Sequence, residues 1–276
     1  MITSRIPALL AVASVAAFCG SASAQVKTWN FGDRNPSGSC TGTFAANNTS
    51  TTTNNGNVIN CTQQPSGTVV DLTLRAYSTT GTNSTFATAA VNDQNGNGVA
   101  VYNTTETRNG AAPNHAMDND GTGIDAMLLR FTSAEILNKI TVGWSGADGD
   151  FQVLRWTGAT NATVTTVQSS IVGRSASNML QSNGGSWQLV SLVNGTGGID
   201  NPNVTFNNFN TTNASSSYWL ISAYNSGFGG TGFTHGIDAI KLLGVGTGVA
   251  VSAPGTLALA GFGLLAAGFL RRRNAA

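Results

Sequence analysis

Short runs in which apolar residues occupy alternate positions constrain the fold of this chain most. Every second residue is apolar within Val70–Tyr77, and a period of two puts those side chains on one face of a β-strand. We therefore expect an all-β fold over residues 68–247, an antiparallel β-sandwich of the jelly-roll type. Similar runs, separated by turns rich in Asn, Gly and Asp, predict further strands at 98–104, 125–131, 139–144, 150–156, 187–193, 203–206, 217–224 and 237–243.

Two segments could form helices, Ser133–Leu137 and roughly residues 164–180, although the second is rich in Thr and Ser. Residues 37–67 consist mostly of Asn, Thr, Ser and Gly, with little to bury. We therefore expect residues 25–67 to be a loop-rich segment that precedes the sandwich. Cys40 and Cys61 could form one disulfide there, closing a loop of about 20 residues and contributing roughly 3 kcal/mol in the chain-entropy model.

The first 24 residues resemble a secretory signal peptide. Arg5 precedes an apolar run at residues 6–18, and Ala22-Ser23-Ala24 supplies the small residues that signal peptidase prefers. We expect cleavage after Ala24. Cys19 raises the alternative of a lipoprotein, but Phe18 is a poor residue to stand before a lipidated cysteine.

The opposite end, residues 251–273, has the order of a membrane anchor with a processing region. Pro254-Gly255 opens it, an apolar run extends from Leu257 to Leu270, and Arg271, Arg272 and Arg273 close it. The run is shorter than the roughly 20 residues of a permanent transmembrane helix. We expect a short transmembrane helix that holds the chain temporarily, with the arginines on the cytoplasmic side. A plain C-terminal tail anchor is the alternative.

The tail resembles the sorting signal of PEP-CTERM (exosortase-dependent) bacterial surface proteins, whose Pro-Gly-Thr is matched by Pro254, Gly255 and Thr256. The first Pro and the Glu of that motif are replaced here by Ser252 and Ala253. The resemblance implies an exosortase-type processing enzyme as partner and a position at the cell surface or in the extracellular or biofilm matrix. The body of the chain resembles the same class of proteins at 114–119, 125–131, 142–146, 150–158, 187–190 and 238–245.

Charge excludes one class of partner. Arg5 would leave with the signal peptide and three arginines with the tail, so nine basic residues would remain against 12 acidic ones. The exported part would then carry a net charge of about −3, without a cluster of Lys or Arg, which argues against nucleic acid as a partner.

Motifs for catalysis are weak. The sequence has two histidines, His115 and His235, and neither lies in a nucleophile elbow. A triad of His115, Asp118 and Ser145 has no support from sequence spacing. Residues 227–232 fit GxGxxG, but no helical pattern follows them, so we expect a flexible loop rather than a dinucleotide site. We expect that the protein is not an enzyme.

Calcium is the one candidate cofactor. Asp93, Asn95 and Asn97 alternate as oxygen ligands do in a calcium loop, although Thr104 stands where an EF-hand needs its bidentate acid. Asp118, Asp120 and Asp125 offer further oxygens, as do the acids of Asp148-Gly149-Asp150. The alternative is that these loops are ordinary β-turns, which use the same residues.

One short motif occurs twice. Gly-Ile-Asp-Ala enters an apolar run at residues 123–126 and again at 236–239. The structural interpretation is a pair of similar sandwich strands, and the alternative is a tandem ligand motif.

Two function classes follow. The first is a non-enzymatic, exported surface or matrix protein that contacts polysaccharide through its polar faces. The second is a secreted carbohydrate-binding module or carbohydrate-active enzyme. An enzyme needs two carboxylates about 5 to 9.5 Å apart in a cleft. A binding module instead needs a concave face without such a pair.

Overall fold

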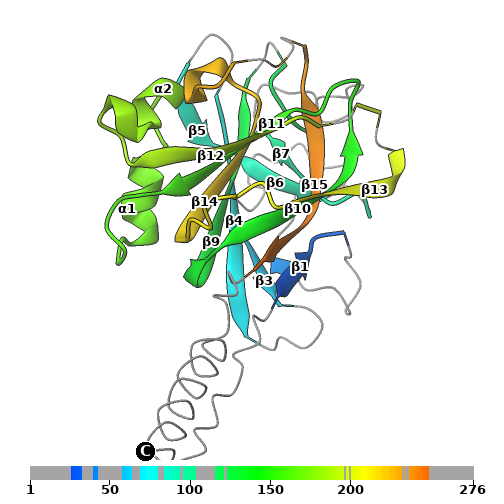
Figure 1. Cartoon of the computed structure of the whole chain (residues 1–276), viewed down its shortest axis with the longest axis horizontal. Helices are drawn as coiled ribbons and strands as arrows, with labels where there is room; N and C mark the ends of the chain where they lie inside the picture. The colour runs from blue at the N-terminus through cyan, green and yellow to red at the C-terminus, as the bar shows by residue number, and fades with distance from the viewer. Residues whose placement is uncertain are drawn as a thin grey trace, which may run out of the picture. The chain divides into compact units, whose positions relative to one another are not determined.

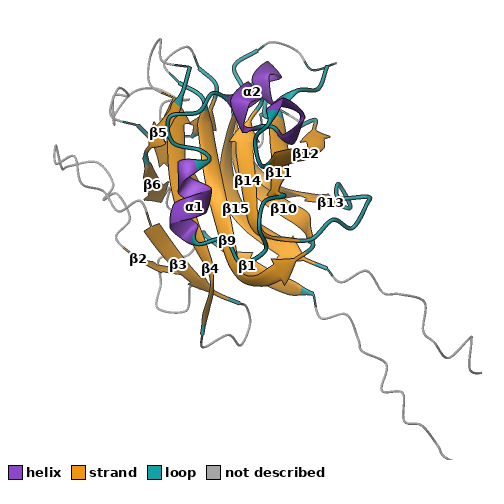
Figure 2. Cartoon of the chain, turned by 90° about the vertical axis from the view of Figure 1, so that its left-hand side faces the viewer, coloured by secondary structure: helices purple, strands orange, loops and turns teal. Residues whose placement is uncertain are grey.

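Two antiparallel sheets pack face to face in the computed structural model of this chain, and short helices cover the outer face of one sheet (Figure 1, Figure 2). This arrangement confirms the predicted all-β, two-sheet fold. The structure describes residues 26–32, 40–42, 58–63, 69–79, 84–93, 96–103, 116–120, 123–195, 197–198, 200–231, 233 and 236–248.

The first sheet has seven strands among the described residues. Its main path runs β13 (Asp200–Asn207), β10 (Leu137–Ser145), β15 (Ala239–Thr247), β7 (Val99–Tyr102) and β6 (Ala90–Asp93). Two further short strands, β1 (Lys27–Asn30) and β8 (Met117–Asp118), also pair with β15. Strand β15 is therefore the centre of this sheet, and it is buried along its whole length.

The second sheet has eight strands within the same described ranges. Its path runs β12 (Trp187–Val193), β11 (Phe151–Trp156), β14 (Ser216–Ala223), β9 (Asp125–Glu135), β4 (Val70–Thr79), β3 (Val58–Thr62) and β2 (Cys40–Gly42), while β5 (Phe86–Thr88) pairs with β4. The helical pieces are α1 (Val164–Ser169), α2 (Ala176–Met179) and the 3-10 turns η1 (Gln181–Asn183) and η2 (Ser226–Phe228).

The part of the second sheet that lies under the helices is buried on both faces, which explains its most apolar strand. In β9, Met127 and Leu129 point into the core between the sheets, whereas Ala126 and Leu128 pack under the helices. A strand buried on both faces has a continuous apolar run instead of a strict alternation. Figure 2 shows α1 and α2 lying over this outer face.

The prediction of a helix at residues 164–180 was partly right. The segment forms the two short helices α1 and α2, capped by the hydroxyls of Thr163 and Ser175, with Gly173 at a positive φ of 75° between them. The helix expected at Ser133–Leu137 was wrong, because β9 continues to Glu135 and β10 begins at Leu137. Pairing of Glu135 with Ser216 of β14 keeps this segment extended.

The described part of residues 25–67 differs from the loop-rich segment that we expected. It supplies β1 to the first sheet and β2 and β3 to the second. Cys40 and Cys61 lie directly opposite each other in the β2–β3 pair and are joined by a disulfide, as predicted. Such a bond indicates an oxidising environment, extracellular or periplasmic.

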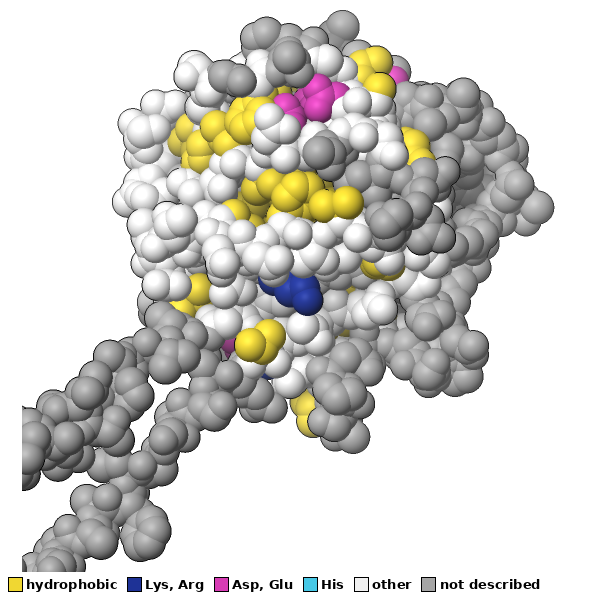
Figure 3. All heavy atoms as spheres, turned by 45° about the vertical axis from the view of Figure 1, so that its right-hand side comes forward, with side chains coloured by type: hydrophobic (Ala, Val, Ile, Leu, Met, Phe, Trp, Pro, Cys, Tyr) yellow, Lys and Arg dark blue, Asp and Glu magenta, His cyan; other side chains and the backbone are white. Residues whose placement is uncertain are grey.

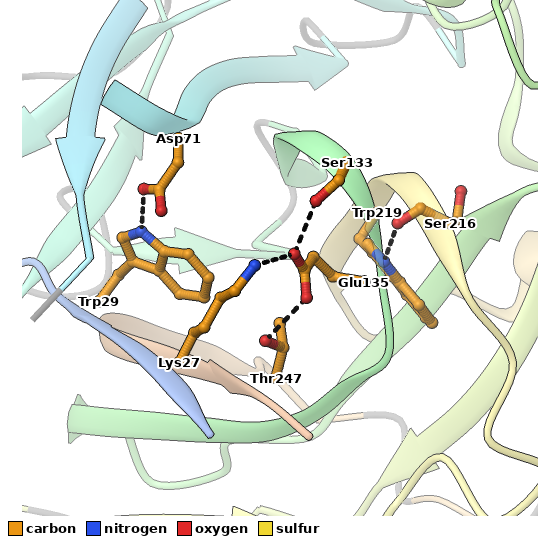
Figure 4. A network of polar contacts seen from close by, with 8 residues as sticks. All are labelled: Lys27, Trp29, Asp71, Ser133, Glu135, Ser216, Trp219 and Thr247. Atoms are coloured by element: carbon orange, nitrogen blue, oxygen red, sulfur yellow. Dashed lines mark hydrogen bonds and ion pairs between the residues drawn. The ribbon is translucent and has the colours of Figure 1, made fainter. Parts of the chain in front are cut away.

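A polar network fixes β1 to the rest of the sandwich (Figure 4). Glu135 accepts hydrogen bonds from Lys27, from Ser133 Oγ at 2.8 Å and from Thr247 Oγ1 at 3.2 Å. Trp29 Nε1 donates to Asp71 Oδ1 at 2.7 Å, which joins β1 to β4 of the other sheet. Lys27 is also the register partner of Thr247, so β1 lies beside the end of β15.

Both predicted targeting segments lie outside the described residues. They are the signal peptide at 1–24 and the sorting signal at 251–273 with Pro254, Gly255, Thr256, Arg271, Arg272 and Arg273. Among the residues that the structure does describe, every helix is too short to cross a membrane.

Candidate functional site

Three carboxylates meet where loops join the two sheets. Asp148 and Asp150 lie between β10 and β11, and Asp238 stands directly before β15. One carboxylate oxygen from each of the three lies within 4.8 Å of the others. Asp150 and Asp238 are almost completely buried, at 3% and 0% exposure, whereas Asp148 is partly exposed.

Backbone amides hold these carboxylates in place. Asp238 Oδ1 accepts from Asp150 N at 3.1 Å, and Asp150 Oδ1 accepts from Gly195 N at 2.9 Å. The loops approach so closely that a Cβ on Gly195 would lie 1.9 Å from the carbonyl oxygen of Gly149. Gly195 is therefore needed for the two loops to approach each other and for its N–H to reach Asp150.

Asn119 ties the cluster to the segment that follows β8. Its Nδ2 donates to Asp238 Oδ2 at 2.7 Å and to the Tyr224 carbonyl at 2.9 Å, and its Oδ1 accepts from Asp238 N at 2.7 Å. One amide side chain thus joins the start of β15 to the end of β14.

A second acidic group lies on the same short segment. Asp118 N donates to Asp125 Oδ2 at 3.3 Å, and Asp120 N donates to Asp118 Oδ1 at 3.1 Å. Asp118 and Asp125 are buried, at 1% and 0% exposure. Asp118 and Asp125 therefore lie close together, with Asp120 on the same segment as Asp118, and Asn119 joins that segment to Asp238. Among the described residues, the carboxylates that converge as a possible metal group are instead those of Asp148, Asp150 and Asp238.

The repeated Gly-Ile-Asp-Ala motif receives a structural explanation from these contacts. Asp125 begins β9 of the second sheet, and Asp238 precedes β15 of the first sheet. The two strands lie in different sheets, so they do not pair with each other. Instead, each aspartate binds the same segment, residues 118–119, from its own sheet.

Burial changes the acidity of the cluster. It raises the pKa of Asp238 to about 7, and the neighbouring charges of Asp148 and Asp150 add to the rise, which the hydrogen bonds from Asp150 N and Asn119 reduce. Burial also raises the pKa of Asp150, against a hydrogen bond from Gly195 N. The cluster can therefore share a proton near neutral pH, because like charges so close together do not all ionise easily.

The same oxygens are of the kind that hard cations such as Ca²⁺ prefer. A calcium ion takes six to eight oxygen ligands, so three carboxylates would need carbonyls or water to complete the set. The arrangement fits two chemical roles, a shared proton that links the loops or a hard cation bound at Asp148, Asp150 and Asp238.

Other predicted site residues are placed less fully. The Asp93 side chain, Asn95, His115 and His235 lie outside what the structure describes. Asn97 lies in the turn between β6 and β7 and packs closely against β10. A Cβ atom added to Gly143 would lie 2.4 Å from the Asn97 carbonyl oxygen. Of the remaining triad residues, Asp118 accepts a backbone N–H, and Ser145 Oγ donates to the Gly146 carbonyl at 3.4 Å.

Two of the three carboxylates could be grouped from the sequence. Asp148-Gly149-Asp150 was visible as a turn with two acids, but Asp238 is 88 residues from Asp150 and was noted as part of the repeated motif. An aspartate that directly precedes a mostly apolar strand was the available signal. Asn119, the hydrogen-bond partner of Asp238, is 119 residues away, and no feature of the sequence pointed to it.

Several acidic side chains of the described residues are withdrawn from the surface. Asp118, Asp125, Asp150 and Asp238 are all buried, so these acids contribute little to it. Figure 3 shows a face on which uncharged side chains and backbone prevail, with small hydrophobic patches and little Lys, Arg, Asp or Glu. Lys241 lies under the partly exposed Trp144, with Nζ 4.6 Å from the ring centroid, and is only 5% exposed.

Comparisons of the chain with protein-family models, with curated proteins and with solved structures found no match. The functional assignment therefore rests on the residues and the geometry described above.

Proposed function

We propose that this protein is a non-enzymatic, exported surface or matrix protein. It is sorted by an exosortase-type signal at its C-terminus, with the membrane holding residues 257–270 before processing. After release it is retained at the cell surface or in the extracellular matrix through contacts with polysaccharide.

The distribution of charge is the observation that supports this function best. Four of the 12 acidic residues are buried at 3% exposure or less, and charged residues make up 9% of the chain. Among residues 203–207 of the edge strand β13, whose side chains the structure describes, the exposed ones are Asn203, Thr205 and Asn207. Hydroxyl and amide groups can form hydrogen bonds with the hydroxyl groups of a sugar polymer. Attraction of a charged partner would instead need charged side chains at the surface.

The disulfide and the polar network favour a protein that works outside the cytoplasm. Cys40–Cys61 joins the edge strand β2 to its neighbour β3, and Glu135 holds β1 beside the end of β15. Both devices stabilise the sandwich where a chain end or an edge strand would otherwise open.

The alternative is a secreted carbohydrate-active enzyme, and the carboxylate geometry argues against it. Glycosidases separate their two carboxyl groups by about 5 to 5.5 Å or by about 6.5 to 9.5 Å, with both facing the sugar. Here one oxygen from each of Asp148, Asp150 and Asp238 lies within 4.8 Å of the others. Asp150 and Asp238 are buried and bound to backbone amides, so they do not face a sugar in solvent. A binding module without hydrolysis stays the closer alternative.

Retention by native matrix tests this function. Protein recovered from the exporting host should stay with washed extracellular polysaccharide in high salt and leave when the polysaccharide is digested. Release by salt alone, or recovery only in the culture medium, would contradict the proposal.

Sorting has its own test. Pro254→Ala combined with Gly255→Ala should trap a longer, membrane-bound form in the host, while Asn274→Ala, beyond the arginine cluster, should process normally. Equal processing of both variants would argue against recognition of this motif.

A further inference from the structure

A groove of about 500 Å³ lies beside β12, the edge strand of the second sheet. One wall comes from Leu180, Gln181 and Ser182, at the end of α2 and in η1. The remaining lining is Trp187, Gln188 and Leu189 of β12 with Phe228 and Gly229 at the end of η2. This volume is within the range of about 300 to 1,000 Å³ that small-molecule sites occupy.

The chemistry of the lining is neutral and amphipathic. None of these eight residues has an ionisable side chain. Gln181, Ser182 and Gln188 are exposed and can both donate and accept hydrogen bonds. Leu180 and Leu189 are partly exposed and present apolar surface beside them. Hydroxyl groups and C–H faces alternate on a sugar ring, so this mixture suits an uncharged glycan better than an ion or a lipid.

Gln188 has a fixed orientation. Its Oε1 accepts a hydrogen bond from Arg155 Nε at 2.8 Å, so its Nε2 is the donor end. The Arg155 guanidinium also donates to the Ser215 carbonyl at 3.5 Å. Arg155 therefore positions the amide instead of offering its charge as a lining group.

The walls of the groove are rigid. Trp187 Nε1 donates to Ser170 Oγ at 2.8 Å, and its ring packs edge-on against Trp156. Phe228 stacks on Phe86 with 6.0 Å between ring centroids, and Gly229 O accepts from Gln152 Nε2 at 2.9 Å. Walls that are already ordered reduce the entropy lost when a ligand binds.

An added β-strand is a poor occupant at this place. Leu180 forms a parallel bridge with Trp187, so the edge of β12 is already covered at the groove. Recognition here therefore depends on side chains, whereas a peptide that extends the sheet needs open backbone groups.

We propose that this groove binds a short segment of a neutral polysaccharide. The inference rests on the proposed function and adds to it the location of the contact and the uncharged class of the glycan. Gln181, Ser182 and Gln188 bind the sugar hydroxyls, while Leu180 and Leu189 pack against the C–H face of a ring.

Calorimetry tests the inference. It measures the binding of the full exported chain to soluble hexasaccharides of cellulose, xylan, dextran and chitin. At least one of these probes should bind, and alginate oligomers should not. Gln181→Ala combined with Gln188→Ala should weaken binding at least tenfold. The matched pair Asn161→Ala and Asn194→Ala, exposed amides outside the lining of the groove, should change it less than twofold.

A second variant guards against a merely structural effect. Ser182→Trp fills the groove without removing either amide and should also block binding, with an unchanged melting temperature. Equal binding by the groove and control pairs, binding of alginate instead, or failure of all four neutral probes would overturn the inference. If the chain still stays with native matrix polysaccharide in any of those cases, the proposed function survives and only the groove is wrong.

Discussion

Asn119 and Asp238 bind each other through both their side chains and their backbones. Asp238 N donates to Asn119 Oδ1, Asn119 Nδ2 donates to Asp238 Oδ2, and Asn119 N donates to the Asp238 carbonyl at 3.1 Å. This pairing links β8 to the start of β15. It also carries the carboxylate that approaches Asp148 and Asp150.

Asn119→Ala should therefore destabilise the fold strongly. The change removes the amide that accepts a hydrogen bond from Asp238 N and donates one to the Tyr224 carbonyl. Water reaches this region poorly, so it replaces these hydrogen bonds incompletely. The expected loss in the free energy of unfolding is about 2 to 4 kcal/mol. Urea unfolding measures it, with exposed Asn207→Ala as the control, which should change stability by less than about 0.5 kcal/mol. Similar values for both variants would contradict a structural role of this pair.

Stability should also depend on pH through Asp238. Its pKa rises from the ordinary 3.8 to about 7 in the folded protein. The folded state therefore keeps a proton that the unfolded chain has already released, so stability falls as pH rises between about 4 and 7 and levels off above that. Asp238→Asn removes the titrating group and should flatten this dependence in urea unfolding from about pH 4.5 to 8. An unchanged slope in the variant would assign the pH dependence to other groups.

Calcium should have little effect on the melting temperature. Asp118 Oδ1 and Asp125 Oδ2 already accept backbone N–H bonds, as do Asp150 and Asp238, so these acids serve as turn-fixing groups. Melts in millimolar Ca²⁺ and in EGTA should coincide. A bound ion at a hundredfold excess over Kd would instead add about 2.7 kcal/mol. Such a stabilisation, lost in Asp118→Ala or Asp93→Ala, would show that the loops form a metal site.

The disulfide should contribute measurably to stability. Cys61 is completely buried in the main core, and its partner Cys40 lies on the short edge strand β2. Cys40→Ser combined with Cys61→Ser should lower the free energy of unfolding by about 2 to 4 kcal/mol. Alkylation of the unfolded, unreduced exported chain should label no thiol. Two labelled cysteines would mean that the bond does not form in the host.

Local patterns predicted the long strands well. β4 was recognised because its apolar residues alternate, and β15 because it is rich in apolar residues. β1 and β3 were missed because the buried residues described in them are few, Trp29 in β1 and Ile59 and Cys61 in β3, and lie in polar segments. β1 pairs with β15, which is distant in sequence, whereas β2 pairs with β3 and β3 with β4.

The candidate sites were predicted less completely for the same reason. Asp118, Asp120 and Asp125 were grouped because they are close in sequence, and calcium binding by them stays a prediction, whereas the Asp150–Asp238 contact depends on the packing of two loops. The groove beside β12 had no signal at all, since Leu180, Gln188 and Phe228 come from three separate elements. Only the folded sandwich brings them together.

Intact-mass measurement of the protein isolated from the surface of its own host tests the central claim most directly, because it reports both ends of the mature chain at once. We expect a chain that begins at Gln25, carries one disulfide and ends upstream of Leu257. A mass that still includes Arg271–Arg273 would contradict processing at the C-terminus and indicate a permanent tail anchor. A mass that still includes residues 1–24 would contradict export by a cleaved signal peptide.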